Sequence, residues 1–180
     1  APVYGINTGF GFLAETRIKP DDLKALQVNL VKSHACGVGA PLELELTRAL
    51  LAFRIHSFLL GHSGVSRELV ERLVQLLQLD ILPLVPCKGS VGASGDLAPL
   101  AHLALPLLGE GEVFWEGNKL SAKEAFTKAN ISLYELKAKE GLSLINGTLF
   151  MATVGSFAVC EAHRLLDVAN KIAAISLDGL

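Results

Sequence analysis

The sequence has few cysteines and no pattern that would place them in disulfides or at a metal. Cys36, Cys87 and Cys160 are odd in number and widely spaced in a chain of 180 residues, which fits neither a disulfide framework nor a Cys-x-x-Cys site. His56 and His62 would face different sides of a helix, and no His-Glu-x-x-His motif occurs. We therefore expect a protein of a reducing, cytoplasmic compartment that binds no metal.

The sequence also lacks a strong charge of either sign and a long apolar run. Lys and Arg number 16 against 18 Asp and Glu, a net charge of −2, so there is no electrostatic reason to bind nucleic acid or anionic lipid. No segment reaches the roughly 18 uninterrupted apolar residues of a membrane-spanning helix. Neither nucleic acid nor a membrane is an expected partner.

Two common functional loops are missing as well. No Gly-x-x-x-x-Gly-Lys-Ser/Thr loop occurs, and residues 9–14, GFGFLA, fit Gly-x-Gly-x-x-Ala only formally, because no preceding strand or parallel crossover is predicted. Ser94 lies among glycines, but Gly95 follows it directly, so the Gly-x-Ser-x-Gly spacing of a nucleophile turn fails. A bound nucleotide and a nucleophilic serine are both disfavoured.

Apolar side chains at helical spacing are what the sequence has in abundance. They make up 51% of the chain, and their periodicity predicts a mainly α fold, a helical domain. Residues 148–177 are apolar nearly all round, and such a helix must be enclosed by neighbours, so we expect one long buried helix. Residues 112–120, EVFWEGNKL, predict one small β-hairpin. Shorter helices are predicted between residues 20 and 37, 42 and 60, 66 and 83, 97 and 108, and from 121 onward.

Each end of the chain lies directly beside a recognisable sequence pattern. The chain opens with Ala1 directly before a glycine-rich motif and stops at Leu180 just after the long apolar pattern. Its 180 residues are enough for one domain with a core and too few for two. We expect residues 1–180 to be a single partial domain, truncated at both ends.

Residues 89–99, GSVGASGDLAP, carry the most unusual chemistry. In Ala93-Ser94-Gly95 the backbone nitrogen of Gly95 can attack the carbonyl carbon of Ala93, in a sharp turn that glycine permits. Loss of water from the ring and from the Ser94 side chain would leave a methylene conjugated to a carbonyl, and the N-terminus of a following helix would stabilise negative charge there. The alternative is a turn of small residues before a helix capped by Asp96, and chemistry alone favours that alternative.

The same stretch carries a family resemblance. Residues 89–102, GSVGASGDLAPLAH, resemble the signature of the aromatic amino-acid ammonia-lyases, whose Ala-Ser-Gly triad cyclises to 4-methylideneimidazole-5-one (MIO). Residues 4–11, YGINTGFG, resemble that family's mobile tyrosine loop. Residues 144–148, LINGT, resemble its Asn motif, and residues 139–141, KEG, fit as well. The resemblance covers essentially the whole chain and implies that it is part of a larger all-α lyase fold.

The resemblance implies a role for each site residue. The cyclised triad of residues 93–95 would be the MIO electrophile, with no metal and no nucleotide as cofactor. Tyr4 would take the β-proton of the substrate, although a phenol with a pKa near about 10 needs a lowered pKa or a partner group for this. His34 would bind the side chain of the substrate, and Asn146 its amino group or the ring oxygen of MIO. Asp96 would help the cyclisation by moving protons.

The pair Ser33-His34 indicates the substrate within that family. It resembles the histidine ammonia-lyase pattern, whereas tyrosine and phenylalanine lyases tend to carry His-Leu and Phe-Leu there. The resemblance therefore implies a carbon–nitrogen lyase that converts L-histidine to trans-urocanate and ammonia, as a homotetramer in which several subunits build each active site. A tyrosine or phenylalanine lyase, an aminomutase of the same family and a non-catalytic helical module are the alternatives.

The chain departs from the family pattern at one position and stops short of part of the site. Leu149 stands where family members commonly carry Gln after Asn-Gly-Thr, which bears on the geometry or selectivity of the site. The carboxylate-binding Arg of the family, its further tyrosines and an acidic residue near the substrate ring belong to a C-terminal half beyond these residues. We therefore expect residues 1–180 alone to be inactive.

Overall fold

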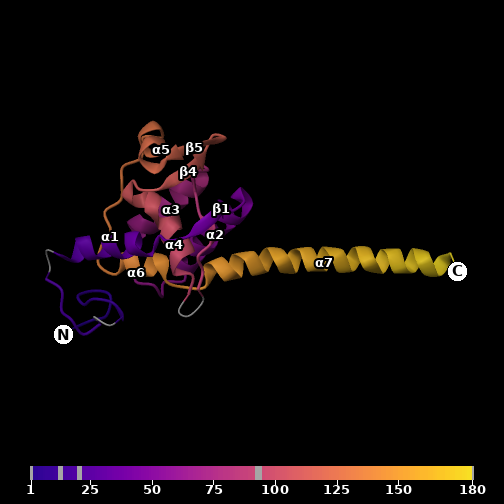
Figure 1. The fold of residues 1–180 in the computed structure, drawn as a ribbon, viewed down its shortest axis with the longest axis horizontal. Helices are drawn as coiled ribbons and strands as arrows, with labels where there is room; N and C mark the ends of the chain where they lie inside the picture. The colour runs from indigo at the N-terminus through magenta and orange to yellow at the C-terminus, as the bar shows by residue number, and fades with distance from the viewer. Residues whose placement is uncertain (1, 12–13, 20–21, 92–94, 180) are drawn as a thin grey trace.

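Helices dominate the structure, a computed structural model that describes residues 2–11, 14–19, 22–91 and 95–179 (Figure 1). This confirms the predicted mainly α fold. A helical body comes first along the chain, and one long helix projects from it toward the C-terminus. The α-helices are α1 (Leu23–His34), α2 (Leu44–Leu59), α3 (Arg67–Gln78), α4 (Leu97–Ala104), α5 (Ala122–Lys128), α6 (Glu140–Ile145) and α7 (Leu149–Asp178), and a short 3₁₀ helix η3 (Leu105–Leu108) continues α4.

Short antiparallel strands tie the loops of the body together. The predicted hairpin is confirmed, and Glu116 and Gly117 form its two-residue turn with φ angles of 50° and 74°, as the twist of a hairpin favours. Three further strands were not predicted, because each is at most four residues long and contains proline. The strands pair as β1 (Val38–Pro41) with β3 (Pro86–Lys88), and as β2 (Leu82–Pro83) with β4 (Glu112–Trp115), which pairs with β5 (Asn118–Ser121).

The core is one hydrophobic cluster to which α2, α3 and α4 all contribute buried side chains. On α3, Leu69, Leu73 and Leu76 recur at helical spacing and are fully buried, and burial of each such side chain contributes about 1.5–3 kcal/mol. Ser66 caps this helix, as its Oγ accepts a hydrogen bond from the Leu69 N–H at 3.4 Å. In α4, six of the eight residues are buried. The residues that precede α4 are therefore anchored to a largely buried helix.

The long predicted helix is confirmed as α7, but it is exposed in this chain rather than buried. It extends away from the body in Figure 1, and Thr153 is its one buried residue among those described. Leu149, in place of the usual Gln, opens the helix and packs against the core. Beyond the first turns, nothing in the described part of the chain covers the helix, and side chains such as Ile172 and Leu177 are exposed. By length and composition alone α7 could also cross a membrane, a property that it shares with core helices.

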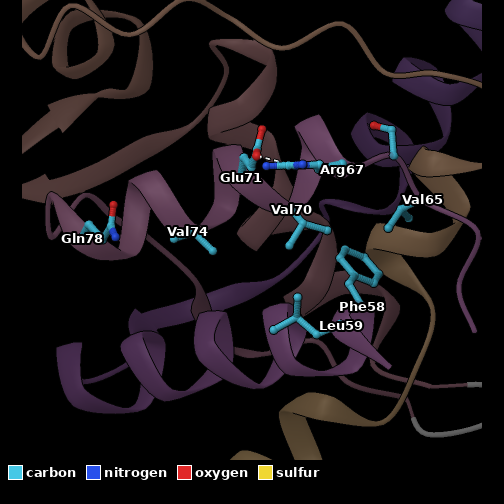
Figure 2. Close-up of a pocket in the computed structure, with 9 residues that line it drawn as sticks. Phe58, Leu59, Val65, Arg67, Val70, Glu71, Val74 and Gln78 are labelled. Carbon is cyan, nitrogen blue, oxygen red and sulfur yellow. Dashed lines mark hydrogen bonds and ion pairs between the residues drawn. The ribbon is translucent and has the colours of Figure 1, made fainter. Parts of the chain in front are cut away.

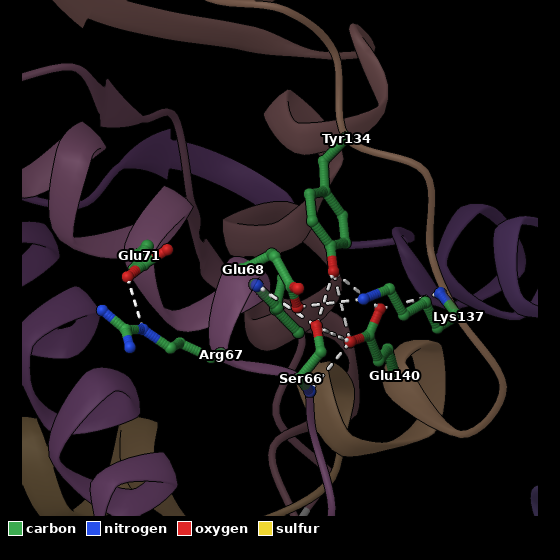
Figure 3. A network of polar contacts seen from close by, with 8 residues as sticks. Ser66, Arg67, Glu68, Glu71, Tyr134, Lys137 and Glu140 are labelled. Atoms are coloured by element: carbon green, nitrogen blue, oxygen red, sulfur yellow. Dashed lines mark hydrogen bonds and ion pairs between the residues drawn. The ribbon is translucent and has the colours of Figure 1, made fainter.

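A buried carboxylate holds the start of α6 (Figure 3). Glu140 is only 1% exposed. Its Oε1 accepts hydrogen bonds from the Ser66 N–H at 3.1 Å and from the Ser66 hydroxyl at 2.7 Å, and its Oε2 accepts one from the Lys137 N–H at 2.7 Å. The Tyr134 hydroxyl donates to the same carboxylate. Burial, together with the nearby carboxylate, raises the pKa of Tyr134, so the phenol stays a hydrogen-bond donor at neutral pH.

The surroundings of Gly141, the residue after Glu140, explain why the motif at residues 139–141 ends in glycine. A Cβ on Gly141 would lie 2.7 Å from the backbone oxygen of Gln27, a distance at which one of the two segments must move. The Gly141 N–H donates to the Gln27 Oε1 at 2.9 Å. Residues Glu140 and Gly141 therefore lock the short helix α6 against α3 and α1.

Replacement of the buried carboxylate should destabilise the protein. In Glu140→Gln the amide group cannot accept all of the hydrogen bonds from Ser66, Tyr134 and Lys137. We expect the free energy of unfolding to fall by about 2 kcal/mol or more, since a hydrogen bond to a charged group contributes roughly 1.5–3 kcal/mol. Urea denaturation monitored by circular dichroism measures this change.

The matched control is Glu68→Gln on α3. Glu68 accepts from the Lys137 ammonium at 2.9 Å, but both side chains are exposed, and exposed ion pairs contribute little. We expect no measurable change for this variant. Equal stabilities of the two variants would contradict the structural role of Glu140.

Candidate active site

Two glycine backbones from distant parts of the chain touch at the candidate site. Gly95 and Gly147 form an isolated parallel β-bridge, and the Asp96 N–H donates to the Gly147 oxygen at 2.8 Å. Both glycines have positive φ, 125° and 127°, and a Cβ on Gly95 would lie 2.5 Å from the Gly147 oxygen. The site therefore accepts only glycine at position 95. The contact joins the triad motif to the Asn motif, which are far apart in the sequence.

Asp96 is fully buried beside this contact, and it caps a different helix from the one predicted. Its side chain makes no capping hydrogen bond to α4. Instead its Oδ2 accepts from the Met151 N–H in the first turn of α7 at 3.0 Å, where a carboxylate also suits the helix dipole. Its Oδ1 accepts from the Ser90 hydroxyl at 2.6 Å. This last hydrogen bond joins the residues on either side of the segment that contains the triad. Two residues of the triad, Ala93 and Ser94, lie outside the described residues.

Arg54 on α2 is a buried cation that the sequence analysis missed. It is 3% exposed, and its Nη1 and Nη2 donate to the backbone oxygens of Ser143 at 3.0 Å and Asn146 at 2.9 Å. Burial lowers the pKa of Arg54 to about 10, against the opposite effect of Asp96, so the side chain is still a cation at neutral pH. The only signal in the sequence is an arginine within the apolar stretch 50–55, LLAFRI.

A cavity of about 250 Å³ opens beside Gly95 and is lined also by His34. His34 ends α1, and its Nδ1 lies 2.8 Å from the Leu30 oxygen. Because a carbonyl only accepts, Nδ1 carries the proton, and Nε2 is left as an acceptor in the neutral ring. The lining residues are His34, Cys36, Gly89, Val91, Gly95, Leu97 and Ala98.

Asn146 and Tyr4 lie elsewhere. Asn146 lines a neighbouring cavity of about 350 Å³ together with Arg54 and Lys139. Tyr4 is 51% exposed, and its ring packs edge-on against Phe10 with the centroids 6.0 Å apart. It is not among the described residues that line either cavity.

A third cavity, larger than the two above, is remote from the predicted site residues. About 650 Å³ lies between the end of α2 and α3 (Figure 2). Phe58 and Leu59 face Val70 across it, and an exposed ion pair joins Arg67 to Glu71 at 2.7 Å. It contains no residue that the sequence analysis assigned to the site.

His102 on α4 links the helix after the triad to the loop after α1. Its Nε2 accepts a hydrogen bond from the Gly37 N–H at 3.0 Å, which requires the neutral ring. Burial lowers the pKa of His102. A Cβ on Gly37 would lie 3.1 Å from the imidazole, so the loop can approach this closely because it carries glycine there.

Comparison with known proteins decides the family. The sequence profile of the aromatic amino acid lyases matches residues 1–180. The chain belongs to the aromatic amino acid lyase family. It is 51% identical to a histidine ammonia-lyase of Myxococcus xanthus and 54% identical to one of Sorangium cellulosum, over 99% of this chain in each case. The chain spans about 35% of the length of these curated relatives.

Solved structures agree with the fold. A histidine ammonia-lyase from Trypanosoma cruzi superposes with a TM-score of 0.83 at 40% identity, over 91% of this chain and 30% of that chain. A phenylalanine aminomutase from Pantoea agglomerans reaches 0.86 at 35% identity, over 93% of this chain and 32% of that chain. The prediction that the chain is part of a larger all-α lyase fold is confirmed.

In this aromatic amino acid lyase, the structure brings several predicted site residues together. Gly95 contacts the segment after Asn146 through the backbone, and His34 shares a cavity with Gly95. Asp96 lies at the start of α7. Tyr4 stands apart on its own loop. Among the described residues, no group of three or more His, Cys, Asp and Glu side chains is placed to hold a metal ion.

The half-buried imidazole of His102 should make the stability of this chain depend on pH. The pKa of His102 is lower in the folded than in the unfolded state, where it is about 6.5. The contribution of the neutral ring is therefore fully present above about pH 6.5, and it is lost as pH falls from there through the lower pKa of the folded state. We expect the free energy of unfolding to decrease from pH 7.5 to pH 5, and urea titrations at several pH values measure it.

The comparison that isolates His102 uses two variants. His102→Gln keeps an acceptor for the Gly37 N–H but cannot titrate, so the decrease should become smaller. His62→Gln, on an exposed residue, should follow the unsubstituted protein. A His102→Gln variant with an undiminished pH dependence would refute the assignment.

Proposed function

We propose that this chain is the cofactor-forming part of an ammonia-lyase that eliminates ammonia from L-histidine to give trans-urocanate. The observation that carries the proposal is the Gly95–Gly147 backbone contact, flanked by the buried Asp96 carboxylate. It fits a triad that closes on itself, because glycine at position 95 leaves its backbone nitrogen unobstructed by a side chain. The curated relatives named above, at 51% and 54% identity, are histidine ammonia-lyases.

Ring closure at the triad needs no external reagent. The Gly95 nitrogen bonds to the carbonyl carbon of Ala93, and the carbonyl oxygen leaves as one water molecule together with the hydrogens of the Gly95 and Ser94 backbone nitrogens. The Ser94 hydroxyl leaves with the Cα hydrogen of the same residue as the second. Asp96 would accept and return protons during these losses; its position next to Gly95 in the chain and its hydrogen bonds from Ser90 and Met151 support this role. The resulting MIO supplies an electrophile to the amino-acid substrate.

The remaining site residues bind the substrate and move protons. His34 presents its Nε2 acceptor to the N–H of the substrate imidazole, because its Nδ1 is committed to the Leu30 oxygen. Asn146 orients the substrate amino group or the ring oxygen of MIO. Tyr4 takes the β-proton, and a phenol with an ordinary pKa of about 10 requires a partner group for this step.

The working enzyme is proposed to be a cytoplasmic homotetramer of a longer chain, of which residues 1–180 are one partial domain. The exposed apolar side chains of α7, such as Phe157, Leu165 and Ile172, support assembly because burying them in a partner removes apolar surface from water. The site is completed by residues outside this chain, so the 180 residues alone are inactive. No nucleic acid, membrane, metal or nucleotide takes part.

A second candidate is an aminomutase or a lyase of tyrosine or phenylalanine. The observation in its favour is the good superposition on a tyrosine aminomutase, with a TM-score of 0.82 at 40% identity over 90% of this chain and 30% of that chain. The fold is thus shared across substrates. The presence of His34 beside Gly95 favours histidine, since an imidazole side chain of the substrate can hydrogen-bond to it.

Intact mass and turnover of the full-length protein test the proposed chemistry. We expect the protein to lack the mass of two water molecules and to form urocanate from L-histidine. Ser94→Ala removes the hydroxyl that must leave, so this variant can lose one water molecule at most and should have no turnover. Ser176→Ala, whose hydroxyl donates to a backbone oxygen within α7 at 2.9 Å, is the control and should mature normally. An unsubstituted protein of unshifted mass would exclude the proposal.

Substrate selectivity tests the role of His34. In His34→Leu we expect kcat/KM for L-histidine to fall about tenfold, because one hydrogen bond to the substrate contributes up to roughly 1.5 kcal/mol. Activity on L-phenylalanine should not fall with it. His56→Gln, at an exposed position of α2, is the control. A parallel loss on both substrates in His34→Leu would contradict a role in selectivity.

A further inference from the structure

Arg54 reaches across the body to the end of a different helix. Its two terminal nitrogens donate to the backbone oxygens of Ser143 and Asn146. Both oxygens belong to the C-terminal end of α6, where a helix leaves its last carbonyls without partners. A cation is also favoured there by the helix dipole. Arg54 therefore holds the end of α6 from a separate, buried helix.

The segment that Arg54 holds leads directly to the glycine contact. Gly147 follows Asn146, and a Cβ on Gly147 would lie 3.6 Å from the Arg54 Nη2. The Gly147 oxygen in turn accepts from the Asp96 N–H at 2.8 Å. The residue that Arg54 holds is thus directly adjacent in the chain to the residue against which Gly95 lies. A small displacement of the Asn146 backbone is therefore transmitted to Gly95 through backbone atoms, with no flexible side chain in between.

A charged group is an unusual choice for this position. Arg54 is only 3% exposed, and its Nε has no hydrogen-bond partner among the described residues. Burial of a charge is unfavourable unless it is well compensated, and a neutral donor or water could satisfy the end of a six-residue helix. What the guanidinium adds is two donors in a rigid fork that fix two carbonyls at once.

We propose that Arg54 is a positioning residue for ring closure at the triad. It fixes the Asn146 carbonyl, so that Gly147 in turn fixes the backbone of Gly95, the residue whose nitrogen closes the ring. Arg54 does not touch the reacting atoms, and its own bonds do not change. The inference rests on the proposed function and deepens it by naming a residue outside the three sequence motifs.

The rate of maturation in the full-length protein that carries this sequence tests the inference. Mass spectrometry follows the fraction that has lost two waters after synthesis, and circular dichroism checks the fold. In Arg54→Met we expect ring closure to be slowed about ten- to a hundredfold, since misplacement of reacting groups has effects of that size. Arg54→Lys keeps the charge but not the fork, and it should be slowed to a smaller extent.

Arg48→Met is the matched control, on the same helix. Arg48 is exposed and pairs with Asp80 at the surface, so this variant should mature at the unsubstituted rate. Because Arg54 also holds the backbone of Asn146, the rate of ring closure is compared with the free energy of unfolding rather than with kcat. A maturation rate that falls only in proportion to stability in Arg54→Met and Arg54→Lys would indicate a general structural role and overturn the inference.

The remaining outcomes are also decisive. A folded Arg54→Met protein that matures at the unsubstituted rate overturns the inference. If Arg54→Met does not fold, the Arg54→Lys protein decides in the same way: slower ring closure supports the inference, and an unchanged rate overturns it. A failure of the unsubstituted protein to lose two waters is distinguishable from both, because it removes the proposed function itself.

Discussion

The contact between the backbones of Gly95 and Gly147 is the constraint on which the rest of the site depends. Neither residue has a side chain, and a Cβ at position 95 would come within 2.5 Å of the Gly147 oxygen. Each glycine is fixed from its own side of the molecule. Gly95 precedes α4, six of whose eight residues are buried, and Gly147 follows α6, which is held by buried polar groups. The packing of α4 and the polar groups that hold α6 together determine the position of this backbone contact.

The way α6 is held shows why a short helix can serve as a support. Six residues are far too few for a stable isolated helix. A buried carboxylate, Glu140, lies at its N-terminal end, and a buried guanidinium, Arg54, lies at its C-terminal end. This order of charges matches the direction of the helix dipole. The helix is therefore stabilised by groups at its two ends more than by its own hydrogen bonds.

Much of the fold and the identity of the motifs could be predicted from the sequence, because both depend on the order of residues within short segments. Leucines at helical spacing indicated α3, and the pattern of residues 112–120 indicated the β4–β5 hairpin. What could not be predicted are pairings between distant segments. Asp96 looked like a cap of its own helix, yet its partner is Met151. Arg54 has no motif at all, because its partners are backbone oxygens roughly 90 residues away, and any sequence supplies such oxygens.

The hydrogen bond from Met151 to Asp96 gives the projecting helix a mechanical meaning. A helix of 30 residues is a stiff rod of about 45 Å at 1.5 Å per residue. Its near end is bonded to the carboxylate beside the triad, and its far end stands clear of the body (Figure 1). A rod pivoting at one end converts a sideways displacement at its tip into a tilt at its base. Whatever grips the distal turns of α7 therefore acts as a lever on the geometry around Asp96.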